Sequence, residues 1–377
     1  MGLGASEITE VVKQSAREAG FELAGIAPVR EFAELRHFHE WIAAGHAGEM
    51  KYLETRDEAG ALKRASLQSV APWARSVIVC AANYNADQPY STQVEDADKG
   101  WISRYAWSEE DYHDAVMRRL TVVDQKLKEV CSHPFARSAK EWGTQDGIRT
   151  RCYVDTGPVV ERVYAKYAGV GWIGKNTCII NQKVGSWLFL GVILTSLELQ
   201  ADVPAPDRCG TCTRCIDACP TDALIAPYQM DSNRCIAYLT IEKRGTIPEE
   251  LRAGIGRHVF GCDICQDVCP WNRKAPRTGA TEFQPREGLV NPALEWLAEM
   301  SAEEFREQFR GSPMRRTKRT GLRRNAAIAM GNSGERRFGR TLEKLAADED
   351  KDVAESARWA REKLLGDSMT DSSGPKR

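Results

Sequence analysis

The sequence has no long hydrophobic run. Across its 377 residues, no stretch approaches the roughly 18 consecutive apolar side chains that a membrane-spanning helix needs. Residues 1–20 have the pattern of an amphipathic helix, without the apolar core or the twin-arginine pair of an export signal. We therefore expect a cytoplasmic protein with no membrane partner.

The sequence also lacks an excess of charge of either sign. Its 52 Lys and Arg against 53 Asp and Glu give a formal net charge of −1, so any binding of nucleic acid must come from a local basic patch. The sequence lacks the glycine-rich phosphate loops of P-loop and dinucleotide-binding proteins. It therefore gives no support for the binding of ATP or NAD. The composition, 42% hydrophobic and 28% charged, allows a sizeable globular core.

The first 200 residues mix helical and strand patterns without a regular βαβ repeat. Apolar spacing predicts helices at 6–19, 31–44, 109–130 and 159–168, and strands at 21–27, 76–82, 152–155 and 187–196. We expect an α/β (α+β) domain around one mixed sheet. Amphipathic patterns at 322–330 and 353–365 predict about one HEAT-type helical pair. The predicted parts are residues 1–200, a cysteine-rich domain at 201–277, a helical region at 278–365 and a disordered tail at 366–377.

Eight of the 12 cysteines lie between Cys209 and Cys269. Such crowding in a reducing compartment is typical of metal or redox chemistry. The first run, Cys209-x2-Cys212-x2-Cys215-x3-Cys219-Pro220, is the bacterial ferredoxin pattern, whose fourth cysteine binds the second of two cubane clusters. The second run is Cys262-x2-Cys265-x3-Cys269-Pro270, with Cys235 upstream.

The two runs predict a ferredoxin-like domain with two 4Fe–4S clusters. Cluster 1 would be held by Cys209, Cys212, Cys215 and Cys269, and cluster 2 by Cys219, Cys235, Cys262 and Cys265. Structural zinc also uses paired cysteines, but three evenly spaced cysteines and two Cys-Pro pairs are not a zinc-ribbon pattern. The other four cysteines, Cys80, Cys131, Cys152 and Cys178, stand singly in apolar surroundings and are expected to be small buried side chains.

Two polar segments of the N-terminal region have more than one interpretation. Asp155 ends a predicted strand before a turn into a helix, where an acid either stabilises the helix N-terminus or acts in catalysis. Asp111-Tyr112-His113 is similar to a cobalamin signature in which histidine replaces the lower base, but Val116 stands where that signature has glycine. We expect His113 to be a structural or pocket-lining residue at a helix start.

A series of ordered motifs runs from about residue 5 to residue 365. They are Arg104-Tyr105-Ala106-Trp107, Asp111-Tyr112-His113, Val154-Asp155-Thr156-Gly157, Glu161-Arg162, Gly171-Trp172-Ile173-Gly174-Lys175-Asn176, Arg234-Cys235-Ile236-Ala237-Tyr238-Leu239-Thr240, Phe260-Gly261-Cys262-Asp263-Ile264-Cys265-Gln266 and Cys269-Pro270-Trp271-Asn272, together with the first cysteine run. In order and separation they resemble the epoxyqueuosine reductase family, which completes queuosine synthesis at the wobble position of tRNA anticodons.

The resemblance implies base-off cobalamin in a nitroreductase-like domain beside the two clusters. It implies that Asp155 is the proton donor. The positions matching cobalamin contacts are Arg64, Ser103, Asp155, Asn176, Ile179, Leu190, Asp263 and Ile264. Some family members have cysteine where Ser103 stands, and Ala237 replaces a common serine. Because an acid catalyst must carry a proton, we expect burial in an apolar pocket to raise the pKa of Asp155.

The resemblance also implies a tRNA substrate, with the anticodons of the Tyr, His, Asp and Asn acceptors. A basic segment at 315–324 would bind its phosphates by charge. The predicted tRNA contacts are Arg162, Arg315, Arg316, Lys318, Arg319, Arg323 and Arg324. An external electron donor is required, and we expect a monomer.

Two other functions fit the cysteine pattern. One is a reductive dehalogenase-like cobalamin and iron–sulfur enzyme acting on small molecules, against which the missing export signal and the basic C-terminal segment argue. The other is a non-catalytic electron-transfer module with an RNA-binding appendage. An N-terminal region of about 200 residues is more than electron transfer alone needs.

Overall fold

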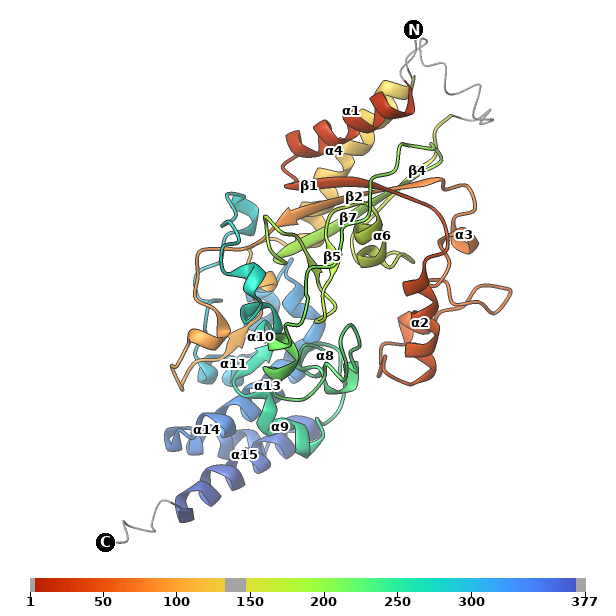
Figure 1. Ribbon diagram of the computed structural model, residues 1–377. Helices are drawn as coiled ribbons and strands as arrows, with labels where there is room; N and C mark the ends of the chain where they lie inside the picture. Colours follow the sequence, from red (N-terminus) through yellow and green to blue (C-terminus); the bar gives the residue numbers. More distant parts are fainter. Residues whose placement is uncertain (1–3, 133–146, 371–377) are drawn as a thin grey trace.

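The computed structural model describes residues 4–132 and 147–370, and its centre is a four-stranded sheet (Figure 1). The strands, in spatial order, are β1 (Leu23–Pro28), β2 (Ser76–Asn83), β7 (Leu188–Thr195) and β4 (Thr150–Tyr153). All three neighbouring pairs are antiparallel. The predicted strands are confirmed within a few residues, but the expected mixed sheet is wrong, so the domain is α+β.

The middle strand β2 explains why the sheet has helices on both faces. Every residue of β2 is buried, and successive side chains of a strand point to opposite faces. Ile78 and Cys80 pack with α1 (Ala5–Glu18) and α4 (Tyr112–Ser132), whereas Val77 and Val79 pack with α6 (Glu161–Tyr167) and the ends of α2 (Ala33–Ala43) and α3 (Leu67–Val70). Figure 1 shows α1 and α4 above the sheet and α6 below it.

The cysteine-rich region lies beside this domain and is joined to it by a short parallel pair. β3 (Trp101–Ile102) pairs with β8 (His258–Phe260), while β5 (Trp172–Ile173) pairs with β6 (Ile179–Ile180). The helices of the region are α7 (Arg214–Asp217), α8 (Ile236–Ile241), α9 (Glu249–Ile255) and α10 (Ile264–Asp267). Segments 150 residues apart in the chain therefore meet next to Cys262.

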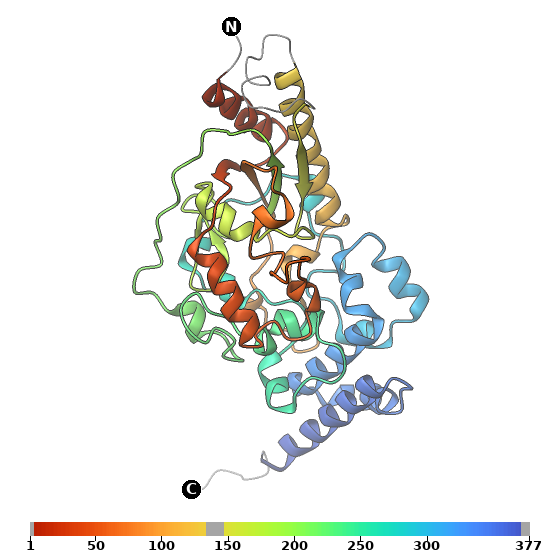
Figure 2. The same cartoon turned by 90° about the vertical axis from the view of Figure 1, so that its right-hand side faces the viewer.

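The C-terminal helices are α11 (Leu294–Glu299), α12 (Ala302–Gln308), α13 (Lys318–Ser333), α14 (Gly339–Ala346) and α15 (Lys351–Thr370). They share one core with Trp101 and Trp107 of the N-terminal region. Figure 2 shows α14 and α15 at the C-terminal end of the molecule. Among the described helices, none combines the length and apolar character needed to cross a membrane.

Two predictions for the C-terminal region are corrected. The pattern at 322–330 predicted an amphipathic helix, but α13 is buried at Leu322 and at every position from Arg324 to Gly331, because it lies among α11, α14, α15 and β8. The tail was predicted from residue 366, but α15 continues to Thr370. Residues 371–377 lie outside the described part of the chain.

Candidate active site and cluster ligands

Asp155 follows β4 directly, in an unusual backbone conformation. Its φ is 58°, a left-handed value that few residues other than glycine adopt and that is often found at functional sites. The main-chain oxygen of Asp155 accepts a hydrogen bond from Arg64 at 3.5 Å, and a second Arg64 nitrogen donates to the carbonyl of Val159 at the same distance. Arg64 thus fixes both sides of the loop that presents Asp155.

The Asp155 carboxylate is surrounded by polar groups and is half-exposed. Tyr112 donates its hydroxyl to Oδ2 at 3.3 Å, His113 Nε2 lies 3.7 Å from Oδ2, and Arg316 Nη1 lies 4.0 Å from it. The contact with His113 lowers the pKa of Asp155 to about 2; burial opposes this, while the charge of Arg316 adds to it. The expectation of a raised Asp155 pKa is therefore wrong, because the partners are cationic rather than apolar.

His113 carries the proton that the carboxylate lacks. Its Nδ1 lies 2.6 Å from Asp111 Oδ1, so the imidazole bridges two carboxylates. Burial alone would lower the pKa of His113, but the hydrogen-bond and charge interactions with Asp111 and Asp155 outweigh it and raise the pKa to about 9. At neutral pH the structure therefore holds an imidazolium against Asp155.

A cavity of about 460 Å³ opens beside this pair. It is lined by Tyr105, Asp111, Tyr112, His113, Gly311, Ser312, Pro313, Arg315 and Arg316. Three of these side chains, Tyr112, His113 and Arg316, are the contacts of Asp155. The cavity is therefore lined by the Asp111 carboxylate, the His113 imidazole and two guanidinium groups, and Asp155 lies behind three of its lining side chains.

Arg316 reaches the site from the C-terminal region through contacts that the sequence did not indicate. It donates to the hydroxyl of Tyr52 at 3.1 Å, lies 5.5 Å above the centre of the Tyr52 ring and pairs with Glu242. Arg64 lies over the same ring at 5.8 Å. Tyr52 and Glu242 belong to no motif, and no sequence signal marks them.

Two of the predicted cofactor contacts, Ser103 and Asp263, bind each other. The Ser103 hydroxyl donates to Asp263 Oδ1 at 2.5 Å, and Oδ2 accepts from the indole N–H of Trp101 at 3.0 Å and from the Arg104 amide at 2.8 Å. Both residues are nearly fully buried. The Asp263 carboxylate is thus already satisfied by the protein and fixes the segment beside Cys262.

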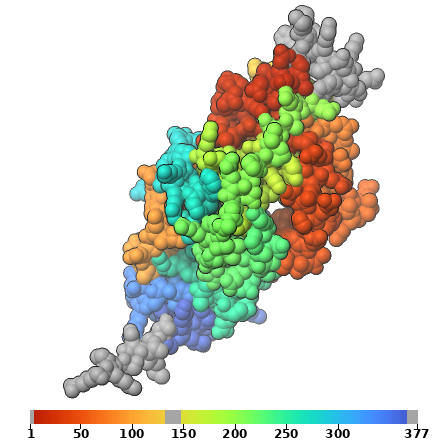
Figure 3. All heavy atoms as spheres, viewed as in Figure 1, coloured from red at the N-terminus to blue at the C-terminus, as the bar shows by residue number. Residues whose placement is uncertain are grey.

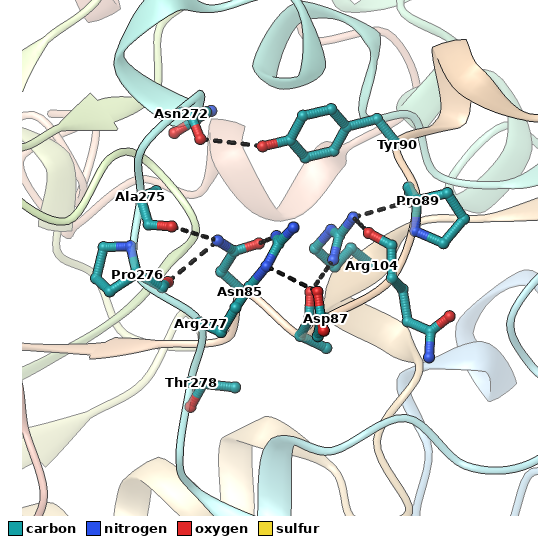
Figure 4. Close-up of polar contacts among 12 residues, drawn as sticks. Asn85, Asp87, Pro89, Tyr90, Arg104, Asn272, Ala275, Pro276, Arg277 and Thr278 are labelled. Atoms are coloured by element: carbon teal, nitrogen blue, oxygen red, sulfur yellow. Dashed lines mark hydrogen bonds and ion pairs between the residues drawn. The ribbon is translucent and has the colours of Figure 1, made fainter.

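A further arginine, Arg104, holds the same segment. Its guanidinium donates to the carbonyl of Pro89 at 2.9 Å (Figure 4), while its amide donates to Asp263. On the neighbouring strand end, Asn85 donates to the carbonyl of Pro276 at 3.1 Å. These bonds tie the loop after β2 to both ends of the second cysteine run.

The other predicted cofactor contacts lie on the sheet side of the cysteine-rich region. Asn176 donates to the carbonyl of Cys265 at 3.2 Å and is itself buried. Ile179 and Leu190 belong to one apolar cluster under the sheet, and Ile264 packs with the apolar cluster around α8. The predicted set is therefore distributed around the cluster-2 cysteines and Asp155.

A larger cavity of about 770 Å³ separates α2 from the cysteine-rich region. Its lining includes Trp41, Val160, Arg162, Trp172 and Thr177. The position of Arg162 is fixed, since it donates to the Thr177 carbonyl at 3.1 Å. Figure 3 shows the hollow where the red N-terminal segment faces the green cysteine-rich segment.

The cluster-1 cysteines are brought together by aromatic packing and by one lysine. Cys269 and Cys209 pack with Trp172, Trp271 and Ile180. Burial raises the pKa of Cys269 to about 11, with the nearby thiols of Cys209 and Cys215 adding to the rise. The ammonium of Lys175 donates to the main-chain carbonyls of Gly210 and Cys212 at 2.7 and 3.0 Å. It thereby holds the loop between those two thiols.

The cluster-2 cysteines form a second set. Burial raises the pKa of Cys262, and the thiols of Cys235 and Cys219 add to the rise. Cys265 interacts in turn with Cys262 and Cys235. The thiols thus group as in the two sets that the cysteine spacing predicted, whose ligation of clusters stays a prediction.

The surroundings of the thiols fit iron–sulfur clusters. Backbone N–H groups point at the sulfurs: that of Ala223 donates to Cys219 at 3.3 Å, and those of Ala237 and Tyr238 act on Cys235. Hydrogen bonds of this kind stabilise the thiolates of such clusters. Because Ala237 contributes its main chain, the serine it replaces is not needed for this contact.

The basic segment 315–324 is not one continuous surface. Arg315 and Lys318 are exposed, but Arg323 pairs with Asp348 at 2.7 Å and Arg319 donates to the carbonyl of Met300 at 2.9 Å. Arg324 is buried and donates to three main-chain carbonyls, those of Leu239, Lys243 and Gly245. The prediction that Arg324 contacts tRNA is therefore wrong.

Two family models match the chain. Residues 64–156 match the model "Epoxyqueuosine reductase QueG, DUF1730", and residues 208–272 match a "4Fe-4S double cluster binding domain". The second match covers all eight crowded cysteines, from Cys209 to Cys269, and supports a domain that binds two 4Fe–4S clusters.

Curated relatives and solved structures agree with these matches. An epoxyqueuosine reductase of Xanthomonas campestris pv. campestris is 39% identical over 93% of this chain and 94% of its own length. One of Synechocystis sp. is 41% identical over 80% of this chain and 98% of its own length. A crystal structure of an epoxyqueuosine reductase with an epoxyqueuosine-modified tRNA-Tyr stem loop has a TM-score of 0.82 at 28% identity, covering 99% of this chain and 96% of that one.

A Bacillus subtilis epoxyqueuosine reductase, solved with its catalytic Asp loop swung out of the active site, has a TM-score of 0.81 at 29% identity and covers 96% of this chain and 91% of its own. The relatives match 80–93% of this chain in sequence, the solved structures cover 96–99% of it, and the two family models span Asp155 and both cysteine runs. This chain belongs to the epoxyqueuosine reductase family.

Proposed function

We propose that this protein reduces epoxyqueuosine to queuosine at the wobble position of tRNA, the final step of queuosine synthesis. The observation that carries the proposal is the polar site at Asp155. There a carboxylate with a charged histidine beside it meets a cavity rimmed by Arg315 and Arg316. Relatives of the same name match almost the full chain.

The reaction fixes what the site must supply. An epoxide becomes an alkene and water by gaining two electrons and two protons, with both carbon–oxygen bonds broken and a carbon–carbon double bond formed. The leaving oxygen is a poor leaving group unless it is protonated. A positioned acid contributes typically 10²–10⁴-fold to such a step.

Asp155 and His113 together supply the first proton in this proposal. Asp155 contacts three of the side chains that line the cavity, but its low pKa leaves it ionised, while His113 holds a proton 3.7 Å away. Because the proton prefers His113 to Asp155, the transfer is concerted: His113 gives its proton to the carboxylate only as the carboxylate passes a proton to the leaving oxygen, which becomes strongly basic as its bond to carbon breaks. Tyr112 orients the carboxylate through its hydroxyl.

Base-off cobalamin is part of the proposal. When bound, it would supply a reduced cobalt centre, whose chemistry is that of a strong nucleophile or electron donor toward a strained carbon–oxygen bond. The cavity of about 770 Å³ between α2 and the cysteine-rich region has apolar walls from Trp172 and Ile173, but none of the predicted cofactor contacts is among the residues that line it. The residues that would hold the cofactor are those named from the family resemblance, with Asp263 and Asn176 acting by fixing the adjacent backbone.

The remaining parts of the proposal concern fold details, partners and location. The sheet domain would be nitroreductase-like and α13 to α15 HEAT-like. The protein would act as a cytoplasmic monomer on tRNAs with Tyr, His, Asp and Asn anticodons, with Arg162, Arg315, Arg316 and Lys318 facing the RNA. Phosphate contacts from such side chains position the RNA without reading its sequence.

The test is direct. Protein purified without oxygen, loaded with iron, sulfide and cobalamin and given a chemical reductant, should convert epoxyqueuosine in tRNA to queuosine, as read by nucleoside mass spectrometry. The same preparation of Asp155→Asn is the control and should yield no queuosine. Failure of a fully loaded wild-type protein to convert the nucleoside would refute the proposed function.

A further inference from the structure

Three of the four cluster-1 cysteines lie among exposed residues and the fourth, Cys269, is buried, whereas the cluster-2 cysteines lie toward the active site. Cys209, Cys212 and Cys215 alternate with exposed residues on the loop leading into α7. The extended segment that leads from β7 to this loop runs along the outer edge of the molecule in Figure 2. By contrast, the main-chain carbonyl of Cys265, a cluster-2 cysteine, accepts a hydrogen bond from Asn176, which is buried. The first set is therefore the end of the electron path that faces solvent.

Five cations surround the exposed end. They are Lys183, Arg208, Arg214, Arg273 and Lys274, which we call the cluster-1 face. All five side chains are exposed, and within the described residues none of them forms a hydrogen bond or an ion pair. Unpaired exposed guanidinium and ammonium groups keep their full charge available to a partner.

The cluster-1 face comes from three chain segments that meet at Trp271. Cys209, next to Arg208, packs with Cys269 and Trp271. The turn that carries Lys183 is joined to the segment before Arg273, since the Ser186 amide donates to Asn272 at 2.8 Å. The five charges are thus gathered around one pair of cluster ligands rather than scattered over the surface.

The carboxylates in the same region are few and already engaged. Asp207 accepts from the Cys209 amide at 2.7 Å and from the Tyr228 hydroxyl at 2.5 Å. Asp217 accepts from the Thr213 hydroxyl at 2.8 Å. Five cations against two carboxylates give a locally positive face, on a chain whose formal net charge is −1.

We propose that the cluster-1 face is the docking site of an acidic one-electron carrier protein. The inference rests on the proposed function for its electron demand. In each encounter the reduced carrier loses one electron and the cluster on Cys209, Cys212, Cys215 and Cys269 gains it. Two encounters supply the two electrons that one epoxide consumes. Complementary charge raises the rate of such encounters by steering, typically 10–10³-fold.

RNA is also acidic, but its expected site is elsewhere. The cavity next to Asp155 is rimmed by Arg315 and Arg316 of the C-terminal region, whereas the cluster-1 face consists of residues 183–274. An electron carrier needs access to a cluster edge, and the cluster-1 face is built around that edge. RNA docking on this face is an outcome that the experiment below detects.

The experiment compares two charge-reversal variants of the cluster-loaded protein. The test variant is Lys183→Glu, Arg273→Glu and Lys274→Glu together, which leaves the residues adjacent to cluster cysteines unchanged. The matched control is Arg306→Glu, Arg336→Glu and Arg340→Glu, three exposed cations of the C-terminal region. Cluster reduction is followed by stopped-flow absorbance with a reduced acidic 2Fe–2S ferredoxin, and separately with reduced methyl viologen, a small cation.

At low salt the ferredoxin rate constant of the test variant should fall at least ~10-fold, while that of the control variant stays within ~2-fold of wild type. The wild-type ferredoxin rate should fall with added salt, and methyl viologen, itself a cation, should reduce the test variant at least as fast as the wild type. An unchanged ferredoxin rate in the test variant would overturn the proposal. So would an equal slowing with methyl viologen, which would assign the residues to cluster integrity.

A binding assay with a tRNA stem loop tests the remaining alternative, which is that the cluster-1 face binds RNA. If the test variant lost RNA affinity and kept its ferredoxin rate, the cluster-1 face would be an RNA surface and the proposal would be wrong. Turnover of epoxyqueuosine with chemical reductant reports on the proposed function separately. A protein that accepts electrons from ferredoxin but forms no queuosine would contradict the function and leave the docking site standing.

Discussion

Replacing His113 with glutamine tests the proton supply of the active site. The substitution removes the imidazolium that bridges Asp111 and Asp155 and leaves a polar side chain of similar reach. The shift of the His113 pKa from 6.5 to about 9 corresponds to at most about 3 kcal/mol in favour of the charged form, at 1.36 kcal/mol per pKa unit. That stabilisation is fully present below pH ~6.5 and is lost as the pH rises through ~9.

The activity of the variant should change in both size and pH dependence. Wild-type single turnovers should slow as the pH rises through about 9, where His113 loses its proton. The variant should be ~10²–10⁴-fold slower at pH 7, because it lacks the reservoir that reprotonates Asp155. It should also lack the fall in rate near pH 9. The assay is nucleoside mass spectrometry of quenched samples between pH 6 and 10.

A matched variant keeps the imidazole and changes only its environment. In Asp111→Asn the carboxylate that helps to raise the His113 pKa is gone, so the alkaline fall in rate should move to lower pH while the rate at pH 6 is largely kept. A His113→Gln protein with the wild-type rate and the wild-type fall at high pH would refute the reasoning, whatever its stability.

Four other substitutions probe separate parts of the molecule. Asp155→Asn should keep the absorbance of clusters and cobalamin but form no queuosine in the mass-spectrometric assay; measurable turnover would remove Asp155 from the mechanism. Arg315→Glu should weaken binding of a tRNA stem loop and flatten its salt dependence, whereas Arg324→Met should lower Tm by several degrees with RNA affinity unchanged in folded protein. Lys175→Met removes the ammonium from the Gly210 and Cys212 carbonyls and should reduce the iron and acid-labile sulfide content. Full cluster content with an unaltered reduction potential would contradict a role for Lys175.

Features set by neighbouring residues were predictable from the sequence. The strands that contain Ile78 and Ile193 were predicted correctly. Each is a largely apolar segment of eight residues, which is the pattern of a strand covered on both faces of its sheet. The division of the cysteines into two sets followed from spacing, because a cubane takes three ligands from one short loop. The strand order and the antiparallel pairing of the sheet depend on contacts between segments that are distant in the chain. The local sequence pattern does not indicate such contacts, so neither feature was predictable.

The environment of Asp155 is the clearest case of a long-range property. His113 lies 42 residues before Asp155 in the chain and Arg316 lies 161 residues after it, yet both approach its carboxylate. Chemistry alone suggested that an acid catalyst should be buried among apolar groups. The fold instead places cations there, so the proton resides on the histidine, and the relay through the carboxylate is part of the proposed function.

The basic segment shows how the same kind of residue takes opposite roles over nine positions. Arg316 precedes α13 and reaches outward to Tyr52 and Asp155, whereas Arg324 lies inside α13, which is packed on nearly all sides. A buried guanidinium is tolerated only where its donors are satisfied, and here the carbonyls at the end of α8 and in the loop after it accept them. Arg324 therefore joins α13 to the cysteine-rich region. Charge density along the chain indicated an RNA surface, but the start of the helix at Lys318 decides which of these arginines an RNA phosphate can reach.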